Sequence, residues 1–173
     1  MNRDNKVETE IISEILKLKK RESSKLAPLV VFDIDGTLVN TNAIQHLVSN
    51  GLRRFDTFHR ESINCPPHHN ILSIAKELLN NKVKVIGLSG RQEKYRNLTN
   101  YWLAMNGLPL DELILRPEKY LGNKIQFKTE VIYDLQLSFE IIAIFDDDPK
   151  LLQAWKSCKI PLVVDCPELV KII

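Results

Sequence analysis

Short apolar runs alternate with segments of helical periodicity along most of this sequence, and the alternation restricts the folds that it can adopt. The apolar runs are 29–32, 83–88, 112–115, 141–145 and 160–164, and the segments with helical periodicity are 68–81, 91–106, 123–137 and 148–157. Because the hydrophobicity of runs such as VKVIGL, which has a single lysine, and IIAIF is continuous and not alternating, we expect each strand to be covered on both faces. The pattern therefore predicts an α/β fold with a central parallel sheet and crossover helices.

Residues 6–20 precede this alternation and carry an apolar stripe at mostly helical spacing, which predicts an amphipathic helix. The stripe consists of Val7, Ile11, Ile12, Ile15, Leu16 and Leu18. A chain of 173 residues with 44% hydrophobic content suits one globular domain. We therefore expect a helix and linker at 1–26 and a main domain at 27–173. The helix could pack on the flank of that domain or dock a partner, and the sequence leaves both open.

The overall charge does not indicate a nucleic-acid or membrane partner, since 24 Lys and Arg against 22 Asp and Glu leave a net charge of +2. Any basic surface must then be local. The three cysteines have no zinc-binding spacing, and we expect reduced thiols. No segment reads as a membrane span or a targeting peptide, so we expect a cytoplasmic location and no membrane partner. The sequence does not indicate an oligomeric state.

Polar residues follow the predicted strands, where ligands bind in sheets of this kind. They are Asp33, Asp35, Gly36 and Thr37 after the first strand, Ser89, Gly90 and Arg91 after the second, Arg116 after the third, and Asp146, Asp147 and Asp148 after the fourth. Lys128 lies early in the helix that leads to the fourth strand. We expect these groups to meet at one edge of the sheet.

Four of these aspartates predict a cation site, because clustered carboxylates repel one another and are costly to bury without a counter-charge. They are Asp33, Asp35, Asp146 and Asp147. Oxygen ligands without nearby His or Cys favour Mg²⁺ over zinc. A single aspartate after a strand is often only a turn residue or a helix cap. Carboxylates at two strand ends in this context favour the metal site.

These residues resemble the four motifs of the haloacid dehalogenase superfamily of phosphohydrolases. The resemblance rests on DIDGT, the serine after VIGL, a downstream lysine and IFDDD, in that order across residues 29–173. It implies a three-layer, Rossmann-like α/β/α fold. The spacing, together with SGRQEKYRNLTNYWLAMNGLP, is similar to the phosphatase half of phage-type polynucleotide kinase and 3′-phosphatase, and to small acid-phosphatase-like relatives. No GxxxxGK(S/T) loop occurs in the sequence, so ATP-dependent phosphorylation is not suggested.

The resemblance implies a role for each polar residue. Asp33 resembles a nucleophile that forms an aspartyl phosphate, and Asp35 an acid and base that also offers its carbonyl to Mg²⁺. Ser89 and Lys128 would contact the phosphoryl group, with Lys124 as an alternative to Lys128. The remaining expectations are substrate contacts from Thr37, Gly90, Arg91 and Arg116, a water-mediated or Lys128-directed role for Asp147, and a helix cap at Asp148.

Residues 39–67 are too few for a full cap domain, so we expect a short flap and an open edge. An open edge suits a DNA or RNA 3′ end, a phosphoprotein or a small ester. The basic flap residues Arg53, Arg54, His59 and Arg60 are offset by Asp56 and Glu61. The hypotheses are a polynucleotide 3′-phosphatase, a small-molecule phosphatase, and a catalytically silent module that binds a phosphorylated partner. We interpret Tyr95, Leu98, Trp102 and Met105 as core residues, because they recur at steps of three and four.

Overall fold

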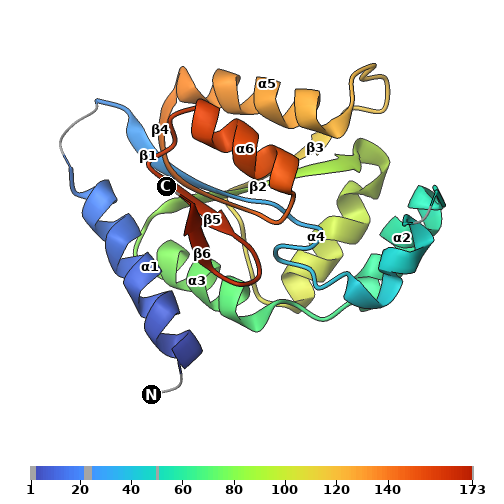
Figure 1. The fold of residues 1–173 in the computed structure, drawn as a ribbon, viewed down its shortest axis with the longest axis horizontal. Helices are drawn as coiled ribbons and strands as arrows, with labels where there is room; N and C mark the ends of the chain where they lie inside the picture. Colours follow the sequence, from blue (N-terminus) through green and yellow to red (C-terminus); the bar gives the residue numbers. More distant parts are fainter. Residues whose placement is uncertain (1–2, 22–24, 50, 173) are drawn as a thin grey trace.

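The computed structural model describes residues 3–21, 25–49 and 51–172, and they form three layers, with a six-stranded sheet between two layers of helices (Figure 1). The strands are β1 (Ala27–Phe32), β2 (Lys84–Gln92), β3 (Glu112–Arg116), β4 (Phe139–Asp146), β5 (Leu162–Asp165) and β6 (Val170–Ile172). The α-helices are α1 (Arg3–Lys19), α2 (Phe55–Glu61), α3 (His69–Asn80), α4 (Arg96–Met105), α5 (Lys124–Gln136) and α6 (Pro149–Ser157). The predicted α/β fold class is confirmed.

The sheet has the strand order β3-β2-β1-β4-β5-β6, and the first five strands of that order are parallel. β1 lies between β2 and β4, with Phe32 opposite Gly87 on one side and Phe145 on the other. The carboxyl ends of these three strands therefore meet at one edge. β6 pairs antiparallel with β5, and the sequence does not predict it because its three residues are too few for a recognisable apolar run.

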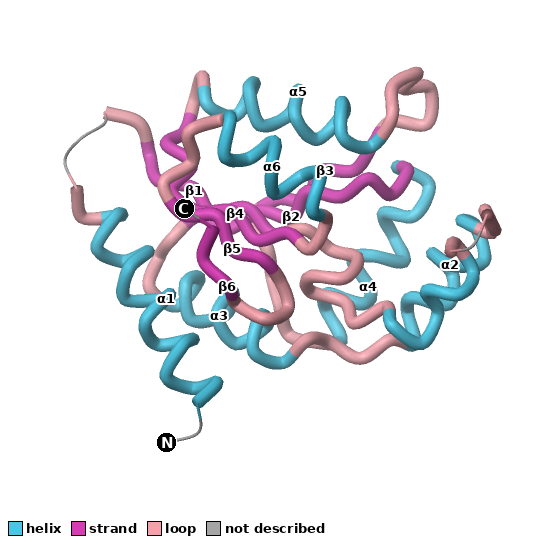
Figure 2. The backbone as a smooth tube through the Cα atoms, in the orientation of Figure 1, coloured by secondary structure: helices cyan, strands magenta, loops and turns pink. Residues whose placement is uncertain are grey.

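Both faces of the sheet are covered, as the continuous apolar runs predict. Along β1, Val30 and Phe32 pack into a core with α1, α3 and α4, whereas Leu29 and Val31 pack into a second core with α5 and α6. Figure 2 shows α5 and α6 on one side of the sheet and α1 and α3 on the other. The period-two alternation of strand side chains thus fills two cores from one strand.

The predicted N-terminal helix forms as α1, and its apolar stripe packs on the domain. Ile11 and Ile15 are fully buried in the core that α3 and β1 share. Lys19 Nζ donates to the carbonyl oxygens of Asn81 and Lys82, at 2.7 and 2.9 Å. Of the two alternatives for this stripe, the structure shows packing on the domain.

The second strand and the following helix differ from the prediction. β2 continues through Gln92, a 3₁₀ turn (η3, Glu93–Tyr95) follows, and α4 begins only at Arg96. Tyr95 and Trp102 are buried as predicted and Leu98 is half-buried, but Met105 is 69% exposed. The prediction for Met105 is wrong because this residue ends α4, where Leu103 and Leu108 occupy the inward positions.

The flap contains α2 and two short 3₁₀ segments, η1 (Asn42–Leu47) and η2 (Ser62–Asn64). Isolated bridges pair Val39 with Asp35 and with Pro67, which fixes the base of the flap beside the first motif. The three cysteines are free and buried. Among the described helices, none combines the length and apolar character needed to cross a bilayer.

Candidate active site

The pairing of β1 with β4 places two aspartates side by side. Asp33 directly follows β1, and its backbone N–H donates to the carbonyl oxygen of Phe145 at 2.9 Å. Asp146 is the last residue of β4. Both side chains are buried, with Asp33 6% and Asp146 2% exposed. The sheet register thus sets these two carboxylates next to each other.

Gly36 allows the loop after β1 to approach the loop after β4. It has φ of 89°, in the left-handed region that favours glycine, and a Cβ there would overlap the Asp147 carboxylate. The turn closes with Gly36 N–H donating to Val39 and Val39 N–H donating to Ile34. Fully buried Thr37 lies at a marginal Oγ1–Oδ1 distance of 3.4 Å from Asp147. The glycine in the first motif therefore serves the contact between the two loops.

Asp33, Asp146 and Asp147 form one carboxylate cluster, with ligand oxygens that all lie within 4.8 Å of one another. Lys128 enters this cluster from α5, with Nζ 2.5 Å from Asp33 Oδ1 and 3.1 Å from Asp146 Oδ2. Trp155 Nε1 also donates to Asp146 Oδ2, at 3.2 Å. One lysine thus faces three carboxylates, which leaves the cluster short of positive charge.

The pKa values in the cluster follow from burial and from this imbalance. Burial raises the pKa of Asp33 well above its usual range, against the attraction of Lys128. Burial and the neighbouring Asp146 raise the pKa of Asp147 to about 6. Burial alone would lower the pKa of Lys128, but Asp146 and Asp33 raise it overall. Three hard oxygen donors with a deficit of positive charge fit a divalent cation such as Mg²⁺.

The Asp35 side chain lies outside this cluster and pairs with Arg91. Arg91 Nε donates to Asp35 Oδ2 at 2.8 Å, and Nη2 donates to Oδ1 at 2.6 Å. Arg91 also donates to Ser62 Oγ of the flap and to Thr99 Oγ1 of α4. Burial would raise the pKa of Asp35, but the charge and hydrogen bonds of Arg91 lower it overall.

Arg91 differs from the expectation of a substrate contact. It is 1% exposed and its guanidinium is occupied by Asp35, Ser62 and Thr99, so it supports a carboxylate instead of reaching into the open edge. The difference arises because β2 runs through Gln92, which keeps Arg91 inside the sheet layer. Ser62 and Thr99 have no local sequence signal that points to this arginine.

The other predicted phosphate contacts lie around the same edge. Ser89 is 1% exposed, and its Oγ accepts from the N–H of Arg91 at 3.2 Å. Gly90 faces Lys124, since a Cβ on Gly90 would approach the Lys124 Cβ at 3.0 Å. Arg116 is half-buried at the end of β3. Their predicted contacts with phosphate remain predictions.

Two helix caps position the charged residues of α5 and α6. Asn123 and Gln126 form a capping box at the start of α5, which places Lys128 in its second turn. Asp148 caps α6 by accepting from the N–H of Lys150 at 2.9 Å, so its predicted role as a cap is confirmed. Asp148 also pairs with Lys124 Nζ at 2.6 Å.

The flap residues do not form one basic patch. Arg53 and Arg54 are exposed, whereas Arg60 pairs with Asp56 at 2.7 Å. His59 turns inward, and only 14% of its side chain is exposed. Its Nδ1 lies 3.9 Å from Asp35 Oδ2, which makes His59 a neighbour of the first motif that sequence reasoning did not place there.

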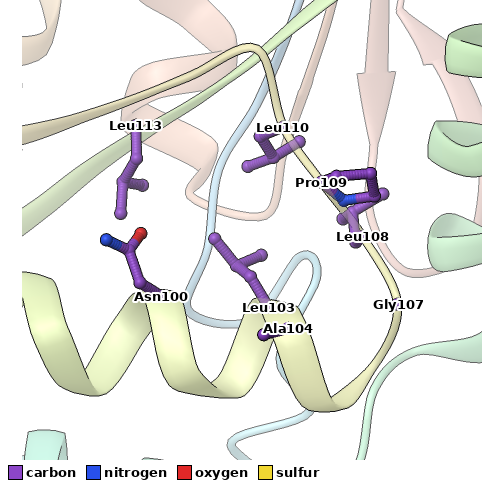
Figure 3. A pocket seen from close by; sticks show the side chains of 8 residues that line it. All are labelled: Asn100, Leu103, Ala104, Gly107, Leu108, Pro109, Leu110 and Leu113. Atoms are coloured by element: carbon purple, nitrogen blue, oxygen red, sulfur yellow. The ribbon is translucent and has the colours of Figure 1, made fainter.

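An apolar hollow of about 490 Å³ lies elsewhere, between α4 and the start of β3. Figure 3 shows Asn100, Leu103 and Ala104 on the helix facing Leu108, Pro109 and Leu110 of the connection. Because Leu113 lines it near the amino end of β3, the hollow belongs to the opposite end of the strand from the carboxylates.

Comparison with protein families gives one match that covers most of the chain. The family described as "Polynucleotide kinase PNKP phosphatase domain" matches residues 27–165, which include Asp33, Asp35, Lys128 and Asp146. The match starts at the first residue of β1. No curated protein matches the sequence.

Solved structures share the fold. A chain of the Pnkp1/Rnl/Hen1 complex superposes with a TM-score of 0.69 and 20% identity over 85% of this chain and 48% of that chain. The class C acid phosphatase from Bacillus anthracis gives 0.66 and 16% over 91% and 73% of the two chains. A haloacid dehalogenase-like hydrolase from Streptococcus pneumoniae gives 0.54 and 12% over 79% and 83%. This chain spans about half the length of its counterpart in the Pnkp1/Rnl/Hen1 complex.

Proposed function

This chain belongs to the family of PNKP phosphatase domains, within the haloacid dehalogenase phosphatases, and from that we propose that it removes 3′-phosphates from nucleic-acid ends. It is therefore a phosphomonoester hydrolase. The observation that carries the proposed chemistry is the buried cluster of Asp33, Lys128, Asp146 and Asp147 at the carboxyl edge of the sheet. A catalytically silent module is disfavoured, because the chain belongs to a phosphatase family.

The proposed reaction has two steps. In the first, an Asp33 oxygen attacks phosphorus, the bond between phosphorus and the sugar oxygen breaks, and Asp35 gives its proton to that oxygen. In the second, water attacks the phosphorus held on Asp33, and Asp35 takes a proton from the water. Inorganic phosphate leaves, and Asp33 is free again.

The contacts of Asp35 in this structure suit the second step of the proposed reaction, in which Asp35 acts as a base. Arg91 favours the ionised carboxylate, which is the form that accepts a proton from water. The first step needs the protonated form, so Asp35 must gain a proton before the sugar oxygen leaves. Because Arg91 is itself held by Ser62 and Thr99, the carboxylate keeps one orientation between steps.

The carboxylates of Asp33, Asp146 and Asp147, together with the Asp35 carbonyl, would hold Mg²⁺. When bound, Mg²⁺ supplies positive charge against the repulsion between the carboxylate and the phosphate. Lys128 supplies a second positive charge beside Asp33, where negative charge develops during attack. We expect Ser89, Thr37 and the Gly90 backbone to orient the phosphoryl oxygens.

The flap supports a large substrate. Residues 39–67 contribute short helical segments, and Arg53 and Arg54 are exposed just before α2. Among the described residues of the flap, neither arginine has an acidic partner at ion-pair distance. A nucleic-acid end would bring phosphates to these arginines. A cytoplasmic location is in keeping with three free, buried cysteines.

The test is a panel of phosphate esters assayed with Mg²⁺. Oligonucleotides with a 3′-phosphate should release phosphate faster than oligonucleotides with a 5′-phosphate, nucleoside 5′-monophosphates or sugar phosphates. Faster hydrolysis of sugar phosphates than of any 3′-phosphate would replace the polynucleotide substrate with a small-molecule one. The Asp33→Asn variant is the control for contaminating phosphatase.

A further inference from the structure

Two buried side-chain nitrogens at the edge of the candidate site have no hydrogen-bond partner among the described residues. They are Nδ1 of His59, on α2 of the flap, and Nε of Arg116, at the end of β3. Buried polar atoms are nearly always hydrogen-bonded, and the exceptions call for a specific explanation. These two unpaired nitrogens come from separate parts of the chain, and a ligand that binds beside the flap would explain both.

His59 lies close to Asp35, the acid and base of the proposed reaction, and Arg116 lies near His59. The His59 ring packs on Tyr95, with centroids 4.7 Å apart, and its Nδ1 is 3.9 Å from Asp35 Oδ2, too far for a hydrogen bond. Arg116 lies opposite Gln92 of β2, one residue beyond Arg91. The charge of Arg116 is near enough to contribute to the lowered pKa of His59.

Arg116 also differs from three other arginines of the chain, which each form an ion pair with a carboxylate. Arg91 pairs with Asp35, Arg60 with Asp56 and Arg96 with Glu93. The contact recorded for Arg116 is a long one, from Nη1 to the Gly122 carbonyl oxygen at 3.4 Å. Within the described ranges, no carboxylate lies at ion-pair distance from it. A half-buried guanidinium without a counter-ion is a favourable site for a phosphate oxygen.

We propose that Arg116 and His59 form a second anion subsite, which takes the phosphodiester that precedes the 3′-terminal nucleotide of the substrate. The inference rests on the proposed function, since it needs a 3′-phosphate at Asp33. β3 lies two strands from β1, so the two strands are about 10 Å apart across the sheet. One sugar separates the two phosphates of a terminal nucleotide, so both fit within that span.

The position of His59 indicates how the nucleic-acid substrate is oriented in the site. Asp35 protonates the departing sugar oxygen in the proposed reaction, and His59 Nδ1 lies beside Asp35. The sugar of the terminal nucleotide therefore lies toward the flap, and its 5′ side reaches Arg116. The subsite binds the negatively charged phosphodiester of the nucleic-acid backbone and does not contact the base. The protein should therefore prefer the 3′ end of an oligonucleotide to a free nucleoside 3′-phosphate.

A neutral linkage tests the proposal. We compare kcat/KM for a dithymidine 3′-phosphate with an ordinary phosphodiester against one with an uncharged methylphosphonate linkage. The wild-type protein should prefer the charged linkage about tenfold, the size expected for one charge-assisted hydrogen bond. Arg116→Gln should bring that preference to within about twofold of unity, and Arg116→Lys should retain part of it.

The preference is a ratio within one variant, so a loss of folded protein or of catalytic power cancels. His59→Phe should also lower the ratio, since it keeps the ring on Tyr95 and removes the nitrogen. Lys156→Gln, an exposed charge in the last turn of α6, is the matched control and should keep the wild-type ratio. Equal rates for both linkages, or an unchanged ratio in Arg116→Gln, would overturn the subsite while leaving 3′-phosphatase activity in place. Failure to hydrolyse either dinucleotide would overturn both proposals.

Discussion

Asp33 and Asp35 are two residues apart, and their surroundings are opposite in charge. Asp33 faces Asp146 and Asp147 with one lysine between them, and its pKa is raised. Asp35 accepts two hydrogen bonds from a buried arginine, and its pKa is lowered. The sharp turn at Gly36 allows neighbouring carboxylates to enter these separate surroundings.

The site thus has two halves, the Asp33 half with Asp146, Asp147 and Lys128, and the Asp35 half with Arg91. They differ in whether the protein itself balances the carboxylate charge. The Asp35 half already has its counter-charge and its supporting hydroxyls, Ser62 and Thr99. The Asp33 half has an excess of negative charge that one lysine cannot balance. We therefore expect the Asp33 half to depend on an added cation and the Asp35 half to depend on the fold.

Replacing each aspartate by asparagine should give the largest effects and should separate the two halves. Asp33→Asn should lower phosphate release by at least about 1,000-fold for every ester, because an amide cannot form the acyl phosphate. Asp35→Asn should affect nucleotide esters more than p-nitrophenyl phosphate, whose leaving group needs little protonation. Equal losses on both esters in Asp35→Asn would argue against its acid role. Circular dichroism of both variants checks the fold.

Removal of divalent cations should abolish activity and leave the hydrogen bonds between Arg91 and Asp35 in place. A chelator should stop phosphate release, and added Mg²⁺ should restore it. Asp146→Ala should raise the Mg²⁺ concentration for half-maximal activity by about tenfold or more, since it removes a cluster carboxylate. The control is Asp148→Ala, which alters the helix cap outside the cluster. Activity that persists in the chelator would contradict the metal site.

Substitution of Arg91 tests whether it is a positioning residue. Arg91→Lys keeps a charge beside Asp35 but loses the two-pronged contact, so kcat for nucleotide esters should fall by about 30-fold with little change in KM. The loss for p-nitrophenyl phosphate should be smaller. Arg96→Gln is the matched control, a partly exposed arginine of α4 that pairs with Glu93. A rise in KM without a fall in kcat would return Arg91 to the role of a substrate contact.

The stability of the metal-free protein should respond to pH through the Asp33 half. The pKa of Asp147 is raised to about 6, and burial also raises the pKa of Asp33 well above its usual range, so the folded state binds more protons than the unfolded state above about pH 4. This contribution destabilises the fold as pH rises from about 4 through 6. The Asp35 contribution is present above about pH 4 and is lost only as pH falls below it, because its pKa is lowered.

His59 and His68, which are both half-buried, act in the opposite direction in the same pH range, since partial burial lowers their pKa values. The measurement is therefore the difference in Tm between the wild-type protein and Asp147→Asn in a chelator. The variant should gain a few degrees, about 3 °C, relative to wild type between pH 4 and 7. Added Mg²⁺ should remove that gain. A difference in Tm that does not change with pH would contradict the charge imbalance.

The sequence predicted the Asp33 half better than the Asp35 half, and the reason is physical. Asp33 and Asp146 each follow an apolar run, and adjacent parallel strands bring such positions together. The contact of Arg91 with Asp35 spans 56 residues and depends on how far β2 extends, which no local pattern fixes. His59 and Ser62 lie on a flap whose path follows from the bridges of Val39.

The most direct measurement for the central claim is the site of the covalent phosphate. A radiolabelled 3′-phosphate oligonucleotide is mixed with the protein and Mg²⁺, quenched in acid during turnover, and the label is located by peptide mapping. We predict acid-stable label on the peptide that contains Asp33, with none in Asp33→Asn. Turnover of the same substrate by the wild-type protein without label on that peptide, even at the earliest quench times, would contradict Asp33 as the nucleophile.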